Sequence, residues 1–142
     1  MSYINTKQAL IQQLLATPIT GIAVDDIAFE NKNFNPANRS AFVSCYFIPA
    51  TADIMGKTSA SSDEQRGVFQ VSVFVQLDSK EFDNTQLQMV DDVLAGFQYN
   101  TQTVYTGQVV QVLSSTANAG TENESWFKRD ISINYLTFSK RG

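Results

Sequence analysis

The side chains that most often perform chemistry are scarce in this chain of 142 residues. It contains no histidine, which excludes Ser-His and Cys-His nucleophilic pairs and histidine metal sites. Cys45 is the only cysteine, so neither an internal disulfide nor a zinc site built from several cysteines can form. Because Cys45 stands inside the apolar run AFVSCYFI, we expect a small buried core residue and not a reactive thiol.

Carboxylates remain as candidates for acid–base or metal chemistry. Pairs that are close in sequence are Asp25-Asp26, Asp63-Glu64, Asp91-Asp92, and Glu122 with Glu124. Hydrolysis by two carboxylates needs them to face each other across a cleft, and neighbours in sequence do not do this by themselves. Asp25 and Asp26 could join a metal site with remote residues, but no spacing indicates one. The stretch DIMGKTSASSDE has too few alternating oxygen donors for a calcium loop.

The stretch MGKTS contains the Gly-Lys-Thr that ends a phosphate-binding loop. That motif also needs a glycine five residues earlier, where Thr51 stands in this chain. It also needs a strand before it and a helix after it, which the surrounding polar residues do not predict. We therefore expect no catalytic, cofactor-binding or metal-binding residue, and no enzyme activity.

Charge and hydropathy narrow the possible partners. The net charge is −4, whereas a domain that grips nucleic acid needs a basic patch. Lys140-Arg141 at the end of the sequence is locally basic, and two charges are too few for such a patch. No apolar run is long enough to cross a membrane, and the N-terminus does not resemble a signal peptide. We expect residues 1–142 to form one domain that begins in a cytoplasm.

Two amphipathic helices are predicted. The first covers Ile4 to Ala16, with an apolar face formed by Ile4, Leu10, Ile11, Leu14 and Leu15, and ends at Thr17-Pro18. The second follows Asp83, which would cap it together with Gln86. Its apolar stripe consists of Leu87, Val90, Val93, Leu94 and Phe97, and Asp91 and Asp92 point away from that stripe.

The strands are read from alternating hydropathy. RGVFQVSVFVQL, residues 66–77, is the clearest, with its odd-numbered residues facing the core. AFVSCYFI is apolar on both sides, which predicts burial on both faces, and Pro49 would end it. Ala50 to Arg66 reads as a long polar loop, as does SSTANAGTENES. TVYTGQVVQVL and WFKRDISINYLTF give further strands; Trp126 and its aromatic neighbours could stack on bases or sugars, although core packing is the favoured interpretation.

Helices that do not alternate regularly with strands argue against a doubly wound parallel sheet. The order predicts an α+β fold with a mixed, mostly antiparallel sheet and two helices packed on one face.

The segments, taken in order, resemble the tail terminator family of tailed bacteriophages. The resemblance rests on the opening helix YINTKQALIQQLLATP, on IAFENKNFNP, on AFVSCYFIPA, on RGVFQVSVF, on VLAGF and on WFKRDISINYLTF. It implies a structural virion protein of the tail or neck that forms a ring, commonly of six subunits. Such a ring would stop growth of the tail tube and join it to head–tail connector proteins, with DNA only passing through. Assembly would take place in the host cytoplasm.

Within that resemblance, Ile54 and Met55 are the large apolar residues of the polar loop 50–66, and Arg66 stands at its end. We expect the loop to be mobile in the free subunit and to dock on the tube through these three residues; a merely disordered loop is the alternative. A head-completion or minor tail protein is an alternative function within the virion. A small ligand-binding domain is the alternative outside it.

Overall fold

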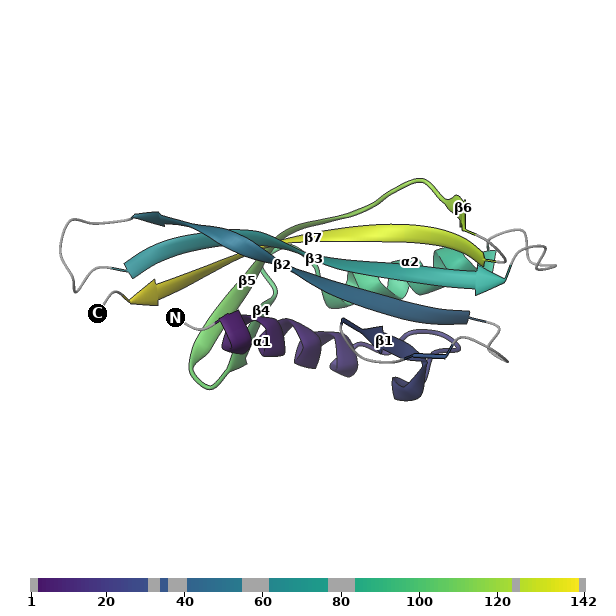
Figure 1. Cartoon of the computed structure of the whole chain (residues 1–142), viewed down its shortest axis with the longest axis horizontal. Coiled ribbons are helices and arrows are strands. Elements are labelled where there is room, and N and C mark those ends of the chain that lie inside the picture. Colours follow the sequence, from purple (N-terminus) through teal and green to yellow (C-terminus); the bar gives the residue numbers. More distant parts are fainter. Residues whose placement is uncertain are drawn as a thin grey trace.

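A computed structural model of the chain describes residues 3–30, 34–35, 41–54, 62–76, 84–123 and 126–140. The elements in chain order are α1 (Tyr3–Ala16), the short 3-10 helix η1 (Val24–Asp26), β1 (Ile27–Phe29), β2 (Ala41–Ile54), β3 (Ser62–Gln76), α2 (Asn84–Gly96), β4 (Gln102–Tyr105), β5 (Gln108–Ala117), β6 (Thr121–Asn123) and β7 (Trp126–Lys140). Strands β2, β3 and β7 run along the long axis of the molecule, and α1 lies beneath them (Figure 1).

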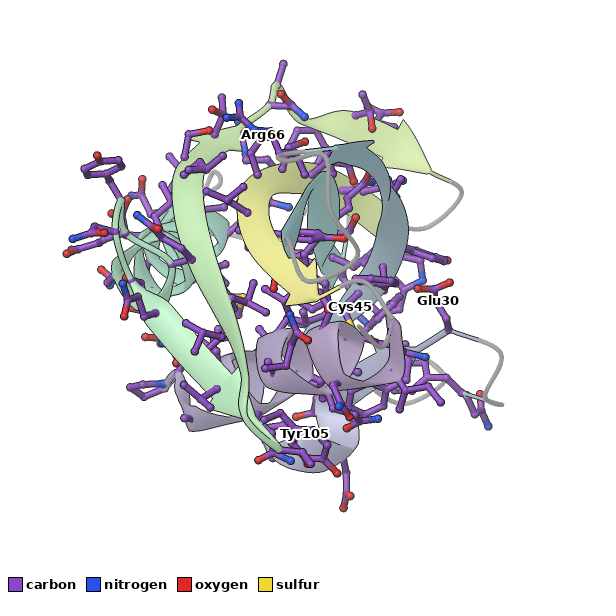
Figure 2. The ribbon with its side chains drawn as sticks, turned by 90° about the vertical axis from the view of Figure 1, so that its left-hand side faces the viewer. Glu30, Cys45, Arg66 and Tyr105 are labelled. Atoms are coloured by element: carbon purple, nitrogen blue, oxygen red, sulfur yellow. The ribbon has the colours of Figure 1, made fainter. Side chains whose placement is uncertain are left out.

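The described strands form one mixed sheet in the order β1-β2-β3-β7-β5-β4, with β6 paired to β7 beside β5. Among the strands that the structure describes, only the β1–β2 pairing is parallel, so the prediction of a mixed, mostly antiparallel sheet with two helices is confirmed. Seen along its long axis, the sheet is strongly curled (Figure 2).

One face of the sheet builds the core, as the alternation in RGVFQVSVF predicts. The odd-numbered residues Phe69, Val71, Val73 and Val75 of β3 are buried, and Val73 opposes Val43 of β2. Residues from both helices join the same apolar cluster, with α1 in contact with β4 and β5 and α2 in contact with β3 and β5. We call the face that carries these odd-numbered residues the inner face.

The helical faces differ from the prediction at individual positions. On α1, Ala9, Leu10, Ile11 and Leu14 are buried, whereas Ile4 and Leu15 are exposed. On α2, Met89 takes the buried place expected for Leu87, which is exposed. Both errors fall at a helix's first turn or at the margin of its apolar stripe, where a small rotation of the helix decides which side chain meets the sheet.

The predicted loop from Ala50 to Arg66 is wrong at both ends. β2 continues through Pro49 to Ile54, and β3 already begins at Ser62. A register shift between the Ile48 and Thr51 pairings admits the proline, because a bulge leaves a residue that need not donate to the ladder. The two strands thus form a long hairpin arm, and residues 55–61 lie outside the described residues.

Gly67 is required where this arm meets the core. A Cβ there would lie 2.5 Å from the Tyr135 hydroxyl oxygen and 2.7 Å from the Ile48 carbonyl oxygen. Tyr135 is the register partner of Gly67, is buried, and stacks on Phe47 with ring centroids 5.8 Å apart. The Arg-Gly start of RGVFQVSVF therefore makes room for a tyrosine ring from β7.

The stretch TVYTGQVVQVL is a hairpin and not the single strand that we predicted. Thr106 and Gly107 have φ of 49° and 80°, and this pair of left-handed residues turns β4 back on β5. Two-residue turns of this kind match the twist of the flanking strands. β5 then continues to Ala117 and β6 follows, so the second predicted polar loop is also largely strand.

Candidate interaction surface

A cavity beside Cys45 lies between α1 and the β1–β2 side of the sheet. It has a volume of about 260 Å³ and is lined by Lys7, Gln8, Ile11, Phe29, Glu30, Cys45, Phe47 and Phe69. Burial, with a smaller contribution from the Glu30 carboxylate, raises the pKa of Cys45 to about 12. The thiol is therefore protonated and unreactive near neutral pH, which confirms the expected buried core cysteine.

Several of the carboxylates accept hydrogen bonds that join neighbouring parts of the fold. Glu30 accepts a hydrogen bond from the Phe47 backbone N–H, and Asp26 accepts one of 2.9 Å from the Ala23 N–H. Asp92 accepts hydrogen bonds from the hydroxyl and the N–H of Thr20, at 2.7 and 2.9 Å. The hydroxyl bond is the largest cause of the lowered pKa of the Asp92 carboxyl. Within the described residues, no group of three or more potential metal ligands gathers.

Two of the three residues predicted to bind a partner, Ile54 and Arg66, lie on the hairpin arm. Ile54 is the last residue of β2 and pairs with Asp63, and Arg66 pairs with Thr51 and Leu136. Arg66 is exposed and lies well away from Glu30 and Cys45, which lie beside α1 (Figure 2). Met55 is outside the described residues. The arm brings Ile54 and Arg66 onto one hairpin, but as strand residues and not as a loop.

The sheet face opposite the core, which we call the outer face, carries a broad area without charge. Its rows follow from the strand register: Tyr46, Gln70, Ser132 and Thr116 form one row, and Ile48, Val68, Asn134 and Ser114 form the next. Tyr46 is 50% exposed and Ile48 45% exposed, so the expectation that this strand is buried on both faces is wrong in its middle.

The same outer face is covered near the start of β2. Phe42 is buried and stacks on Phe74, with ring centroids 4.4 Å apart. The Phe42 and Trp126 rings are nearly perpendicular, with centroids 4.8 Å apart. The Lys128 ammonium lies 5.8 Å from the Phe74 ring centroid. Trp126 thus packs within an aromatic cluster, which favours core packing over a stacking platform for bases.

Charged groups mark the margin of the uncharged area next to this cluster. Asp130 accepts a hydrogen bond of 2.5 Å from Ser72 and lies 3.5 Å from the Lys128 ammonium. At the opposite margin stands Arg66, next to the register pair Asp53 and Glu64. A polar, charged rim around an uncharged centre is the usual anatomy of a protein interface.

Sequence reasoning missed the role of Gln86. Its amide is fully buried and donates to the carbonyl oxygens of Val73 and Phe127, at 3.1 and 2.9 Å, so it joins α2 to two strands and does not cap the helix. Its proposed partner Asp83 lies outside the described residues. The available signal was its place on the apolar side of the helix, one residue before Leu87 and four before Val90.

None of the helices in the described part of the chain is long and apolar enough to cross a bilayer.

Comparison with known proteins provides the fold and the family, which the geometry of the surface alone does not give. A solved chain whose name states no function superposes with a TM-score of 0.74 at 21% identity, over 96% of each chain. A chain of the virion of a native gene transfer agent particle superposes with a TM-score of 0.58 at 15% identity, over 97% of this chain and 100% of the other. At these identities the two likenesses establish the fold. No curated protein matches the chain.

The family model described as phage tail terminator protein matches residues 5–135, which is nearly the whole chain. The match agrees with the family resemblance of the sequence segments and with a surface that carries an interface-like area. The chain belongs to the phage tail terminator family and is a structural protein of the phage tail.

Proposed function

We propose that this protein closes the end of the tail tube as a ring, stops tube growth, and provides the surface on which head–tail connector proteins assemble. The observation that carries this proposal is the family match over residues 5–135. The ring would commonly contain six subunits and would assemble in the host cytoplasm. Its assembly would need no covalent chemistry. The protein would act through binding alone and would have no enzyme activity.

The architecture supports such a role. We infer that residues 1–142 form one domain in which both helices cover the inner face, since Ala9 of α1 accepts a 2.9 Å hydrogen bond from Thr103 and Gln86 of α2 bonds Val73. The outer face is then left for other subunits. With a net charge of −4, the ring would not hold DNA phosphates strongly while the DNA passes through.

A ligand-binding domain is the alternative from another class, and the cavity beside α1 is the feature that would serve it. Its volume of about 260 Å³ is below the range of about 300–1,000 Å³ that is typical of small-molecule sites. Its floor consists of Ile11, Phe29, Cys45, Phe47 and Phe69, with Lys7 and Glu30 as the charged lining groups. Such a lining fits a packing defect of the core better than a site for a polar metabolite.

Electron microscopy of particles made without this protein tests the proposal. We expect tails of abnormal, extended length without heads, and normal tails when the protein is supplied again. Tails of normal length that fail to join heads would favour the head-completion alternative. Complete infectious particles with normal tails would contradict a terminator role.

The arm supplies a proposed contact with the tube. We propose that Ile54 and Met55 act as apolar anchors there, with Arg66 as a flanking charge. Because Ile54 and Ser62 are strand residues, deleting 54–62 would cut the hairpin, so substitution is the sharper test. Replacing Ile54 and Met55 with serine should leave rings intact and weaken their binding to purified tubes. Thr58→Ala is the matched control, and equal tube binding by all three proteins would contradict the anchor role.

A further inference from the structure

The charges of this chain are distributed very unevenly along its length. All 24 charged residues, 10 basic and 14 acidic, lie outside residues 93–121, a stretch of 29 residues with no Asp, Glu, Lys or Arg. Soluble surfaces normally carry about a quarter to a third charged residues. A stretch of this length without charge is therefore expected to be buried, either in the core or against a partner.

The structure shows that much of this stretch is not in the core. It forms the end of α2, the β4–β5 hairpin and the strand that follows. Tyr99 is 74% exposed, Val104 is 57% exposed and its cross-strand partner Val109 is 45% exposed. The turn that presents Tyr99 is fixed: Asn100 has φ of 68°, donates its N–H to the Val112 carbonyl at 2.8 Å, and accepts from the Gln111 amide at 2.6 Å.

Two apolar patches lie at opposite sides of the outer face. The β2 patch consists of Tyr46 and Ile48 with their register neighbours Gln70 and Val68. The hairpin patch consists of Val104 and Val109 with Gln102 and Gln111 beside them. β2 and β4 lie at or next to opposite edges of the sheet, which is strongly curled (Figure 2).

The two patches match each other in chemistry. Each has two exposed apolar side chains, each includes glutamine, and neither contains a charged residue. Packing one patch on the other would therefore bury no unpaired charge. A buried unpaired charge would lower the affinity of the contact several-fold to many-fold. Contact between two different patches is head-to-tail, the kind of contact that closes into a ring when the rotation per subunit allows.

We propose that the hairpin patch of one copy packs on the β2 patch of the next copy, and that this contact builds the ring. The proposal rests on the proposed ring function and adds the surfaces that form it. The expected occupant of each patch is a second copy of this chain; the tail tube is the competing occupant.

Single charges placed in the patches provide the test. Val109→Lys and Ile48→Glu each alter an exposed side chain, so both variants should fold, as judged by an unchanged circular dichroism spectrum. A buried unpaired charge should weaken the contact at least about 100-fold, and each variant alone should sediment as a monomer where the wild type forms rings. Leu87→Lys, an exposed apolar residue on α2, is the matched control and should still form rings.

Mixing the two variants tests whether the patches meet each other. The intact β2 patch of Val109→Lys should bind the intact hairpin patch of Ile48→Glu, so the equimolar mixture should form 1:1 pairs, and opposite charges at the second contact favour larger assemblies. Rings of normal mass from either variant alone, or loss of rings by Leu87→Lys as well, would overturn the proposal. So would variants that form normal rings but fail to bind tubes, which would assign the patches to the tube.

Failure of the ring itself gives a different result. A wild-type chain that stays monomeric at every concentration, with tails of normal length in its absence, would remove the proposed function together with this contact. Wild-type rings that tolerate both charges would remove only the contact.

Discussion

The two faces of the sheet differ in burial and composition, although their residues alternate along the same strands. On the inner face, Phe69, Val71 and Val73 are fully buried in the apolar cluster, which also includes residues of both helices. On the outer face, Tyr46 and Ile48 are about half exposed and no charged residue stands in their rows. The inner face has the composition of a completed core, and the outer face has that of a contact still to be made. Along these strands the buried positions serve folding, and we propose that the uncharged, exposed positions serve assembly.

The largest difference between the two faces is expected in the free energy of unfolding when neighbouring residues of β3 are substituted. Phe69→Ala removes a fully buried ring from the inner face and should lower the free energy of unfolding by about 3–5 kcal/mol, because a cavity remains. Gln70→Ala, one residue on and on the outer face, should change it by less than about 0.5 kcal/mol. Urea unfolding followed by circular dichroism measures both. Equal losses would contradict the assignment of the two faces.

The next effect concerns the reactivity of Cys45 on the inner face. With a pKa of about 12 instead of the ordinary 9.0, its thiolate fraction at pH 8 is smaller by about a thousandfold, and burial blocks access as well. Iodoacetamide should label the folded protein at least that much more slowly than the urea-unfolded protein. Because the folded pKa is raised, labelling of the folded form should keep rising about tenfold per pH unit up to pH 10, whereas labelling of the unfolded form should level off above about pH 9. Rapid labelling of native protein would show that the cavity is open to solvent.

A moderate effect on the free energy of unfolding is expected at Gln86, whose amide joins α2 to the strands. Gln86→Ala leaves the carbonyl oxygens of Val73 and Phe127 without their donor in a buried place, which should cost about 1–3 kcal/mol of unfolding free energy. The exposed Gln88→Ala on the same helix is the control and should cost less than about 0.5 kcal/mol. If the two substitutions had the same effect in urea unfolding, Gln86 would not join α2 to the sheet.

The smallest effect belongs to the exposed contact between Thr20 and Asp92. The hydroxyl hydrogen bond lowers the pKa of Asp92 in the folded state, so its contribution to stability is present above the ordinary value of 3.8 and is lost as pH falls through the folded pKa. Asp92→Asn should therefore be slightly less stable than the wild type at pH 7, and the difference should shrink below about pH 4. Thermal unfolding at several pH values measures it. A difference that grew on acidification would contradict the assigned hydrogen bonds.

Strong periodic segments were predictable from the sequence, because burial of one face leaves a clear alternation. The inner residues of β3, the two helices and the mixed sheet were all found in this way. What the sequence hid were positions where two signals compete. Pro49 indicates a strand end, but a bulge lets β2 pass it, and Thr106-Gly107 is a turn concealed within a valine-rich run.

The candidate surface was less accessible to prediction for a physical reason. The polar composition of residues 50–66 predicts a loop with Ile54, Met55 and Arg66 available to a partner, yet Ile54 and Arg66 lie in paired strands. Which outer residues share a row depends on register, and register between β3, β7 and β5 cannot be read from one strand at a time. The alignment of Tyr46 and Ile48 with Gln70 and Val68 appears only in the folded sheet.

We propose that this chain functions by binding copies of itself through an uncharged surface. Sedimentation velocity of the purified wild-type protein over a wide range of concentration is the test. We expect a reversible, closed assembly of several 15.7 kDa chains, commonly six, whose mass stops increasing once the ring is complete. A species that remains a single chain at the highest concentration, or one that grows without limit, would contradict it.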